Sequence, residues 1–476
     1  MKHRTLIRLF AVLFLLSFYG PLACDSDDDS EPSDNDDEDA GTTADGGGDT
    51  DTDTDTDGEE TCKDGVCIVS GTFTENTTWT ADNQYLLRGG VFIGDDEKKT
   101  VLTIEPGTRI YGETSTMGLL VIRRNSQINA VGTADNPIVF TSSKEPGTRE
   151  RGDWGGLIIN GNAKINACAE DTGRDICEGY GEGGTGWFGG TNDSDNSGTV
   201  KYVRIEFGGH QLSPDNELNG LALQGVGSGT TLDYIHIHKN KDDAIEFYGG
   251  ACNFKHVLAT GTGDDNLDWT DGWRGKGQYF VGQQYDDEGD QGIEADNNGE
   301  NNVAEPYANP TLSNLTFIGS PDSDSSDIGI LLREGTKVTI HNAIVHGFND
   351  ACLNIDNGAT WDNMDSGDLV INNSIIDCDT NYKSVDDEDE NDRDADDVED
   401  WFTSGTGNVV GDPMLEDPFN EDNPGVAPKS GSDAIGGGAA PSDGFFDKVD
   451  FMGGVDPDDD WVAAGIASGW ITFPEN

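Results

Sequence analysis

Short apolar segments recur through the middle of the chain at a nearly constant spacing. In each of them the second and fourth residues are apolar, as in Leu221 and Leu223 or in Ile245 and Phe247. Six such segments begin at Gly220, Ala244, Asn266, Gly292, Gly329 and Cys352. Their starts lie 24, 22, 26, 37 and 23 residues apart. Alternation over a short run is typical of a strand with one buried face, and a repeat of this length is typical of a solenoid.

A second family of β-rich segments lies between the first. Its members are residues 199–207, 231–238, 253–260, 311–318, 338–346 and 369–376. One repeat of two or three short strands cannot bury its inner face alone, but turns stacked about 4.8 Å apart build one continuous core. The sequence therefore predicts an all-β parallel β-helix over residues 61–435. Residues 296–310, rich in Asn and Glu, lengthen one repeat and are expected to project from one face as a loop.

Several phrases of the sequence carry a family resemblance. They are LTIEPGTRI, GTADNPIVFTS, WGGLIINGNAKIN, GVGSGTTLDYI, GTGDDNLDW and the tail that begins FFDKVDFMGG. Over residues 70–476 the chain resembles the right-handed parallel β-helix, or pectin-lyase-like, proteins that bacteria export to their surfaces. The resemblance implies a right-handed parallel β-helix on an exported protein. It implies no agreed activity and supplies no catalytic residues.

The N-terminus reads as an export signal over residues 1–24. Three basic residues precede the short apolar run Leu9–Tyr19, which is too short to span a membrane comfortably. The residues before Cys24 resemble a bacterial lipobox, although Pro21 stands where Leu is usual. We expect lipidation at Cys24, and with it a membrane-anchored lipoprotein at the outer membrane or cell surface of a Gram-negative bacterium. The alternative is an ordinary cleaved signal.

Residues 25–60 have the composition of a disordered tether. They contain 18 acidic residues among 36 and no Lys or Arg, so they cannot build a core. The whole chain has 92 acidic and 28 basic residues, a formal net charge of −64. This charge excludes a nucleic-acid binder that works by neutralising phosphates. Because the acidity continues beyond the tether, it suggests a medium rich in salt or divalent ions.

The eight cysteines suggest an oxidising compartment. Besides Cys24, close spacing suggests two loop disulfides, and a spacing of about one repeat suggests a third between neighbouring turns. These candidate pairs are Cys62 with Cys67, Cys168 with Cys177, and Cys352 with Cys378. Cys252 is then left over and is expected to be buried. The spacing alone does not fix the connectivity.

The C-terminal residues 436–476 depart from the repeat pattern. Their aromatic residues stand among glycines and predict a cap, because the open end of a solenoid exposes sheet edges. The aromatic residues are Phe445, Phe446, Phe451, Trp461 and Trp470. Residues 385–400 are strongly acidic and are expected to form a solvated loop before this cap.

Carboxylates repeat in register with the aligned strands. An Asp stands two residues before five of them: Asp242, Asp264, Asp290, Asp327 and Asp350. The outward position of three successive strands holds Glu246, Asp268 and Glu294. Stacked carboxylates repel one another unless a cation neutralises them, and columns of hard oxygen ligands suit Ca²⁺. We expect a calcium site formed by Asp242, Glu246, Asp264, Asp268, Asp290 and Glu294; the alternative is a structural ladder of turn aspartates bonded to the backbone.

Three functions are compatible with this pattern. The first is a calcium-binding surface lipoprotein that binds a polysaccharide or a surface protein through the side of the β-helix. The second is a lyase or glycoside hydrolase that uses the acids around 242–296. An enzyme predicts a groove over those acids, walled by residues 296–310, with carboxylates of abnormal pKa. The third is a structural coat component.

Overall fold

The computed structural model describes residues 57–169, 175–213, 216–384 and 393–474. The predicted export signal, Cys24 and nearly all of the predicted tether lie outside the described residues. Residues 385–392, half of the predicted acidic loop 385–400, also lie outside them. The other half does not stay a loop, because Asp394 caps an α-helix, Ala395–Ser404, that includes residues 395–400.

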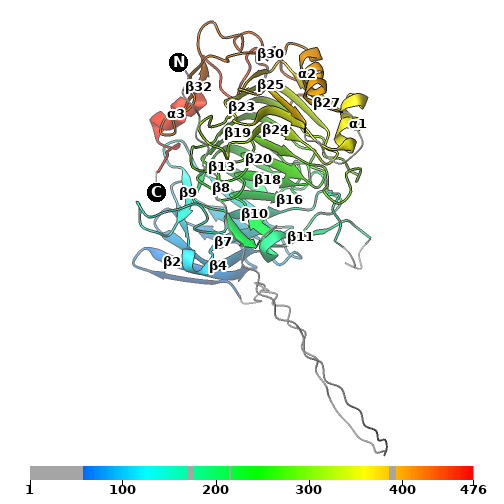
Figure 1. The fold of residues 1–476 in the computed structure, drawn as a ribbon. Helices are drawn as coiled ribbons and strands as arrows, with labels where there is room; N and C mark the ends of the chain where they lie inside the picture. The colour runs from blue at the N-terminus through cyan, green and yellow to red at the C-terminus, as the bar shows by residue number, and fades with distance from the viewer. Residues whose placement is uncertain (1–56, 170–174, 214–215, 385–392, 475–476) are drawn as a thin grey trace, which may run out of the picture. The chain divides into compact units, whose positions relative to one another are not determined.

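One 26-stranded sheet, almost entirely parallel, forms the body of the described chain. The ribbon in Figure 1 shows its strands stacked one above another from β2 and β4 up to β25 and β27. The first turns contain β1 (Glu59–Lys63), β2 (Val66–Phe73), β3 (Thr77–Trp79), β4 (Gln84–Ile93), β5 (Val101–Ile104), β6 (Arg109–Gly112), β7 (Leu119–Ile122), β8 (Gln127–Val131), β9 (Ile138–Ser142) and β10 (Leu157–Asn160). β1 forms an antiparallel hairpin with β2. The strands after it pair in parallel with strands one turn later, as β4 does with β6 and β7, so the predicted parallel β-helix is confirmed.

The aligned short segments form one face of the stack. They are β16 (Leu221–Gln224), β18 (Ile245–Tyr248), β20 (Leu267–Thr270), β22 (Ile293–Ala295), β24 (Ile328–Leu332), β26 (Ala351–Ile355) and β29 (Tyr382–Ser384). Leu221 pairs with Ile245, which pairs with Leu267 and so on along the face. The alternation seen in the sequence therefore sends the same set of side chains into the core in successive turns.

The second family of segments forms longer strands. They are β13 (Gly198–Glu206), β17 (Thr231–His238), β19 (Asn253–Thr260), β21 (Lys276–Gln283), β23 (Thr311–Ile318) and β25 (Val338–His346), continued by β27 (Leu369–Asn372), β28 (Ile375–Asp377) and β30 (Val409–Val410). Each long strand bends at one residue with a φ between 48° and 65°, and these bends occupy one position in successive turns. The bend residues are Tyr202, Tyr234, His256, Tyr279, Asn314 and Asn342. We call them the bend column.

Smaller elements decorate the stack. The hairpins are β11 (Gly179–Gly181) with β12 (Gly186–Phe188), β14 (His210–Ser213) with β15 (Asn216–Leu218), and β31 (Leu415–Asp417) with β32 (Gly425–Pro428). The helices are α1 (Gly358–Ser366), α2 (Ala395–Ser404), α3 (Trp461–Ser468) and the 3-10 turns η1 (Thr114–Thr116) and η2 (Glu182–Gly184). No helix in the described residues is long and apolar enough to cross a membrane.

The aromatic C-terminal segment covers the side of the stack. Arg204 donates to the carbonyls of Gly469 and Trp470, and His238 contacts the carbonyl of Pro474 at 3.0 Å. These partners belong to middle turns, and Figure 1 shows α3 beside the strands. The core at the last turns is instead closed by Val398 and Phe402 of α2. The segment is thus a lateral cover and not the end cap that the exposed sheet edge suggested.

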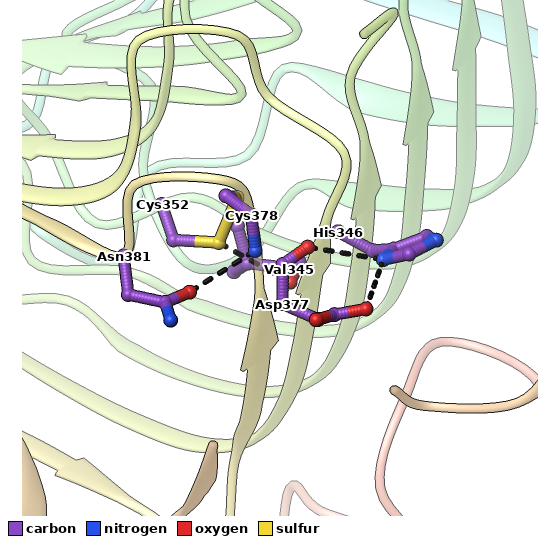
Figure 2. Close-up of a disulfide and its surroundings, with 6 residues drawn as sticks. All are labelled: Val345, His346, Cys352, Asp377, Cys378 and Asn381. Atoms are coloured by element: carbon purple, nitrogen blue, oxygen red, sulfur yellow. Dashed lines mark hydrogen bonds and ion pairs between the residues drawn. A yellow bond between two sulfur atoms is a disulfide. The ribbon is translucent and has the colours of Figure 1, made fainter. Parts of the chain in front are cut away.

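Three disulfides are present in the described residues: Cys62–Cys67, Cys168–Cys177 and Cys352–Cys378. These are the pairs that the spacing suggested, and Cys252 is a buried free thiol. Figure 2 shows Cys352–Cys378 joining β26 to the residue that follows β28, one turn later. Nearby, Asn381 accepts a hydrogen bond from the Cys378 N–H at 3.0 Å, and His346 lies 3.1 Å from a carboxylate oxygen of Asp377.

Candidate functional site

Three acidic side chains stack on the outer side of the short-strand face. Glu246 of β18 pairs in register with Asp268 of β20, which pairs with Glu294 of β22. Their chain neighbours, such as Ile245 and Phe247, point into the core. The column ends at apolar residues on both sides, because Ala222 and Leu331 occupy the same position in the flanking turns. The acids are therefore concentrated on three turns.

The turn aspartates lie against this column. Carboxylate oxygens come within 4.8 Å of one another in three groups, which share Asp243 and Asp264. The groups are Asp242–Asp243–Asp264, Asp243–Glu246–Asp268 and Asp264–Asp265–Asp290. We call these seven residues the acidic cluster. The sequence analysis did not assign Asp243 and Asp265 to the calcium site, although Asp243 belongs to two of these groups and Asp265 to one.

Three predicted acids stay outside the cluster. Glu294 forms an ion pair with Arg333, which also bonds Asp296 at 2.9 Å. Asp350 is paired with Lys383. Asp327 is not in any of the three groups. The regular Asp spacing in the sequence therefore extends further than the site does.

Burial makes the acidic cluster electrostatically unfavourable when all its members are ionised. Burial, and then repulsion from neighbouring carboxylates, raises the pKa of Asp243, Glu246 and Asp265 well above the usual range. The same causes raise the pKa of Asp242 to about 9 and that of Asp290 to about 7. A group of carboxylates with raised pKa values gains free energy from any bound cation.

Two carboxylates of the acidic cluster also accept hydrogen bonds from the backbone. Asp243 accepts a hydrogen bond from the Asp265 N–H at 3.1 Å, and Asp265 accepts one from the Gln291 N–H at 2.5 Å. The Oδ1 atom of Asp268, in contrast, is buried and has no hydrogen-bond partner within the described chain. The donor set is all oxygen and anionic, and one oxygen lacks a partner, so the residues fit a calcium ion completed by water. These backbone bonds form a ladder of Asp243 and Asp265, the residues that directly follow Asp242 and Asp264 of the predicted column.

A cleft of about 720 Å³ opens beside the acidic cluster. Its floor contains Tyr248 and Asp271, which follow Glu246 and Asp268 at the ends of β18 and β20. One wall comes from residues 298–301 of the predicted insertion. Residues 166–169 and the β11–η2 segment, including Tyr180 and Glu182, also line the cleft. The Asn298 amide donates to Oδ1 of Asn166 at 3.1 Å, so these two parts of the lining are in contact. A projecting loop was expected from the sequence, and it forms one side of this cleft.

Hydrogen bonds connect the cleft to the acidic cluster. The Tyr248 hydroxyl donates to Oε2 of Glu182 at 3.0 Å. The Asn219 amide lies 2.5 Å from Oε2 of Glu246 and 3.3 Å from the Tyr248 hydroxyl. A change of charge at Glu246 therefore affects Glu182 through the side chains of Asn219 and Tyr248.

Two carboxyl groups that line the cleft hold protons unusually strongly. Burial, followed by the charges of Glu182 and Asp268, raises the pKa of Asp271 to about 7. Burial also raises the pKa of Glu182. The position of Asp271 beside the GDDNLDW phrase could be noticed in the sequence. Glu182 and Tyr180 could not be noticed, because the Gly-rich segment 181–186 (GEGGTG) has the composition of an ordinary turn.

A family comparison agrees with this fold. Residues 71–414 of the 476 match a family model described as a pectate-lyase-like β-helix domain. The chain belongs to this family. Its match covers every strand from β3 to β30 and contains both the acidic cluster and the cleft. Neither a search of curated proteins nor a search of solved structures found a match.

Proposed function

We propose that this pectate-lyase-like β-helix is a calcium-dependent polysaccharide-binding protein of the bacterial cell surface. The observation that carries the proposal is the lining of the cleft. Tyr180 is 46% exposed there, and its ring meets that of Trp187 edge to face with centroids 5.0 Å apart. An exposed ring supported in this way can pack against the C–H face of a sugar.

The polar lining supports the same ligand class. The amides of Asn166, Gln224, Asn298 and Asn301 line the cleft together with the carboxyl groups described above. Amides and carboxylates supply both donors and acceptors, which match the hydroxyl groups of a polysaccharide. Lys and Arg are absent from the described lining, so an acidic polymer needs a bridging cation.

Calcium has a defined role in the proposal. Bound at the acidic cluster, it neutralises carboxylates that include Glu246 and Asp268. The contacts from Glu246 through Asn219 and Tyr248 to Glu182 then fix the cleft floor. We therefore expect calcium to strengthen polysaccharide binding without touching the sugar.

Glycoside hydrolysis is the second candidate function. Its supporting observation is that Glu182 and Asp271, both with raised pKa values, line one cleft. A carboxyl group protonated near neutral pH can act as a general acid, and a second carboxylate completes the pair. A lyase has less support, because Arg274 is bonded to Asp193 at 3.0 Å and Lys276 to Asp443 at 2.6 Å.

Replacement of Tyr180 by Ala tests the binding role of the cleft. Affinity is measured by electrophoresis through gels that contain a polysaccharide ligand. We expect the affinity of the variant to fall at least tenfold, because the stacking surface is lost. Phe419→Ala is the matched control, since Phe419 is 45% exposed on the β31–β32 hairpin and is not part of the cleft. Equal loss in both variants, or no loss in Tyr180→Ala, contradicts binding in the cleft.

The proposal places the protein at the cell surface through lipid on Cys24. Replacing Cys24 with Ala is then expected to move the protein from the membrane fraction to the soluble fraction and to abolish labelling by radioactive palmitate. Unchanged fractionation and labelling contradict the anchor. A coat component, the third possibility, differs in forming lateral or end-to-end assemblies of the purified protein.

A further inference from the structure

A second cavity, of about 490 Å³, lies where the C-terminal segment crosses the bend column. One wall contains the bend residues Tyr202, Tyr234, His256 and Tyr279. The other contains Trp461 and Trp470 with the small residues Ala464, Gly465 and Ser468. It shares no lining residue with the cleft described above.

The bend column makes its wall rigid. Successive rings stack with centroid distances of 4.5 Å for Tyr202–Tyr234, 4.2 Å for Tyr234–His256 and 4.8 Å for His256–Tyr279. The register of the long strands places one ring per turn, so no ring can move without its neighbours.

The tryptophans stand across this stack. The Trp461 ring is nearly perpendicular to that of Tyr234, and the Trp470 ring is nearly perpendicular to those of Tyr202 and Tyr234. The indole N–H of Trp461 is fixed by the Gly454 carbonyl at 2.9 Å. The cavity is therefore bounded by aromatic rings on two sides.

The remaining lining is acidic. Asp447, Asp456 and Asp459 line the cavity, whereas no Lys or Arg does so in the part of the chain that the structure describes. Asp447 is paired with Lys255 at 2.6 Å. Asp456 and Asp459 form no ion pair with the described residues. Burial, and then charges that include Asp233 and Asp459, raises the pKa of Tyr234 to about 12.

Ammonium groups already lie against the margin of the bend column. Lys201 Nζ is 5.6 Å from the ring centroid of Tyr202 and 5.3 Å from that of Tyr234. Lys255 Nζ is 5.9 Å from the ring centroid of Tyr279. These distances are within the range of cation–π attraction. The same rings that attract two lysines at the margin thus face a cavity that adds two unpaired carboxylates.

We propose that this cavity binds an organic ammonium cation. Aromatic rings and carboxylates together attract an ammonium group, since the rings favour its weakly hydrated surface and the carboxylates its charge. An anion is repelled by the carboxylates of Asp456 and Asp459, which have no basic partner in the described residues. A bare metal ion has less support, because no three of the acidic and histidine side chains that line the cavity bring ligand atoms within 4.8 Å of one another in the described residues.

Choline and its neutral isostere, 3,3-dimethylbutan-1-ol, test the proposal directly on the purified protein. Binding is followed by tryptophan fluorescence and by titration calorimetry, with calcium and with chelator. We expect saturable binding of choline that is unaffected by calcium and at least tenfold tighter than that of the isostere. Equal binding of the two compounds, or no saturable binding of choline, overturns the proposal.

Variants of the acidic loop before α3 locate the binding. Asp456→Asn with Asp459→Asn is expected to weaken choline binding at least tenfold. Asp458→Asn is the matched control, because Asp458 is exposed in the same loop and does not line the cavity. Thermal melting by circular dichroism checks that the variants stay folded. Folded double variants that bind choline as the original protein does place the ligand elsewhere and contradict the proposal.

Discussion

Asp268 carries the strongest single argument for a cation at the acidic cluster. Its outward position on β20 places it between Glu246 and Glu294, and its buried Oδ1 atom has no hydrogen-bond partner in the described structure. A ladder of turn aspartates explains Asp243 and Asp265, which bond backbone N–H groups. It does not explain Asp268.

Replacing Asp268 with Asn separates a calcium site from a structural ladder. In chelator at pH 8 we expect the free energy of unfolding to rise by about 1–2 kcal/mol, because one of several mutually repelling charges is removed. With calcium we expect the metal-induced gain in stability to shrink and the calcium affinity to fall at least tenfold. Denaturant titrations and calorimetry measure both.

Asp82→Asn is the control for this test, since Asp82 is exposed in an N-terminal turn far along the chain from the cluster. It is expected to change neither quantity. A loss of stability in chelator by Asp268→Asn, with the calcium response intact, contradicts the calcium site and favours the ladder.

At the scale of single residues, the sequence predicted the members of the outward column but not its limits. Glu246, Asp268 and Glu294 are visible because strand alternation fixes their side of the sheet. That Glu294 is neutralised by Arg333 depends on the path of the loop after β24, which periodicity does not contain. Tyr180 and Glu182 reach the cleft through a hairpin whose direction is likewise set by tertiary contacts.

At the scale of elements, stability should depend on pH in two opposite ways. The cluster acids have folded-state pKa values above their unfolded values, about 9 for Asp242 and about 7 for Asp268, because of burial and mutual repulsion. The cluster acids therefore contribute fully to the free energy of unfolding at pH values below about 4, and this contribution is lost as pH rises towards 9. In chelator, the melting temperature is therefore expected to fall between pH 6 and pH 9, and calcium should remove most of this fall.

The histidines beneath the C-terminal segment act in the other direction. His236 and His238 are buried and bond Thr260, and burial lowers the pKa of His238 to about 3. An unfolded histidine titrates near pH 6.5. The contribution of the neutral pair to the free energy of unfolding is therefore complete above that pH and is lost as pH falls below it. Stability in chelator should thus peak between about pH 5 and pH 7. A melting temperature that rises steadily up to pH 9 contradicts the account of the cluster.

The strands themselves were largely predictable, whereas the contacts between elements were not. Short runs with apolar second and fourth residues became β16 to β26 in register. The bend column had no signal, because Tyr, His and Asn at a positive φ are not a sequence pattern. The lateral path of the aromatic tail had none either, since a burial preference does not say which surface provides the burial.

At the scale of the whole molecule, the features divide along the β-helix. The short-strand face holds the acidic cluster and the cleft beside it. The bend column, covered by the C-terminal segment, holds a separate aromatic cavity. Both sites depend on the stacking of turns, which was visible in the sequence as a repeat. This stacking brings together residues far apart in the chain, such as Glu182 and Asn301 in the cleft and Tyr202 and Trp470 in the cavity.

Light scattering of polysaccharide mass tests the central claim most directly. The purified protein is incubated with a panel of neutral and acidic polysaccharides, with calcium or with chelator. We predict that the mass of at least one polymer rises with calcium and not with chelator, which shows calcium-dependent binding without cleavage. A fall in polymer mass contradicts the binding role and establishes the enzyme, and an unchanged mass for every polymer contradicts a polysaccharide ligand altogether.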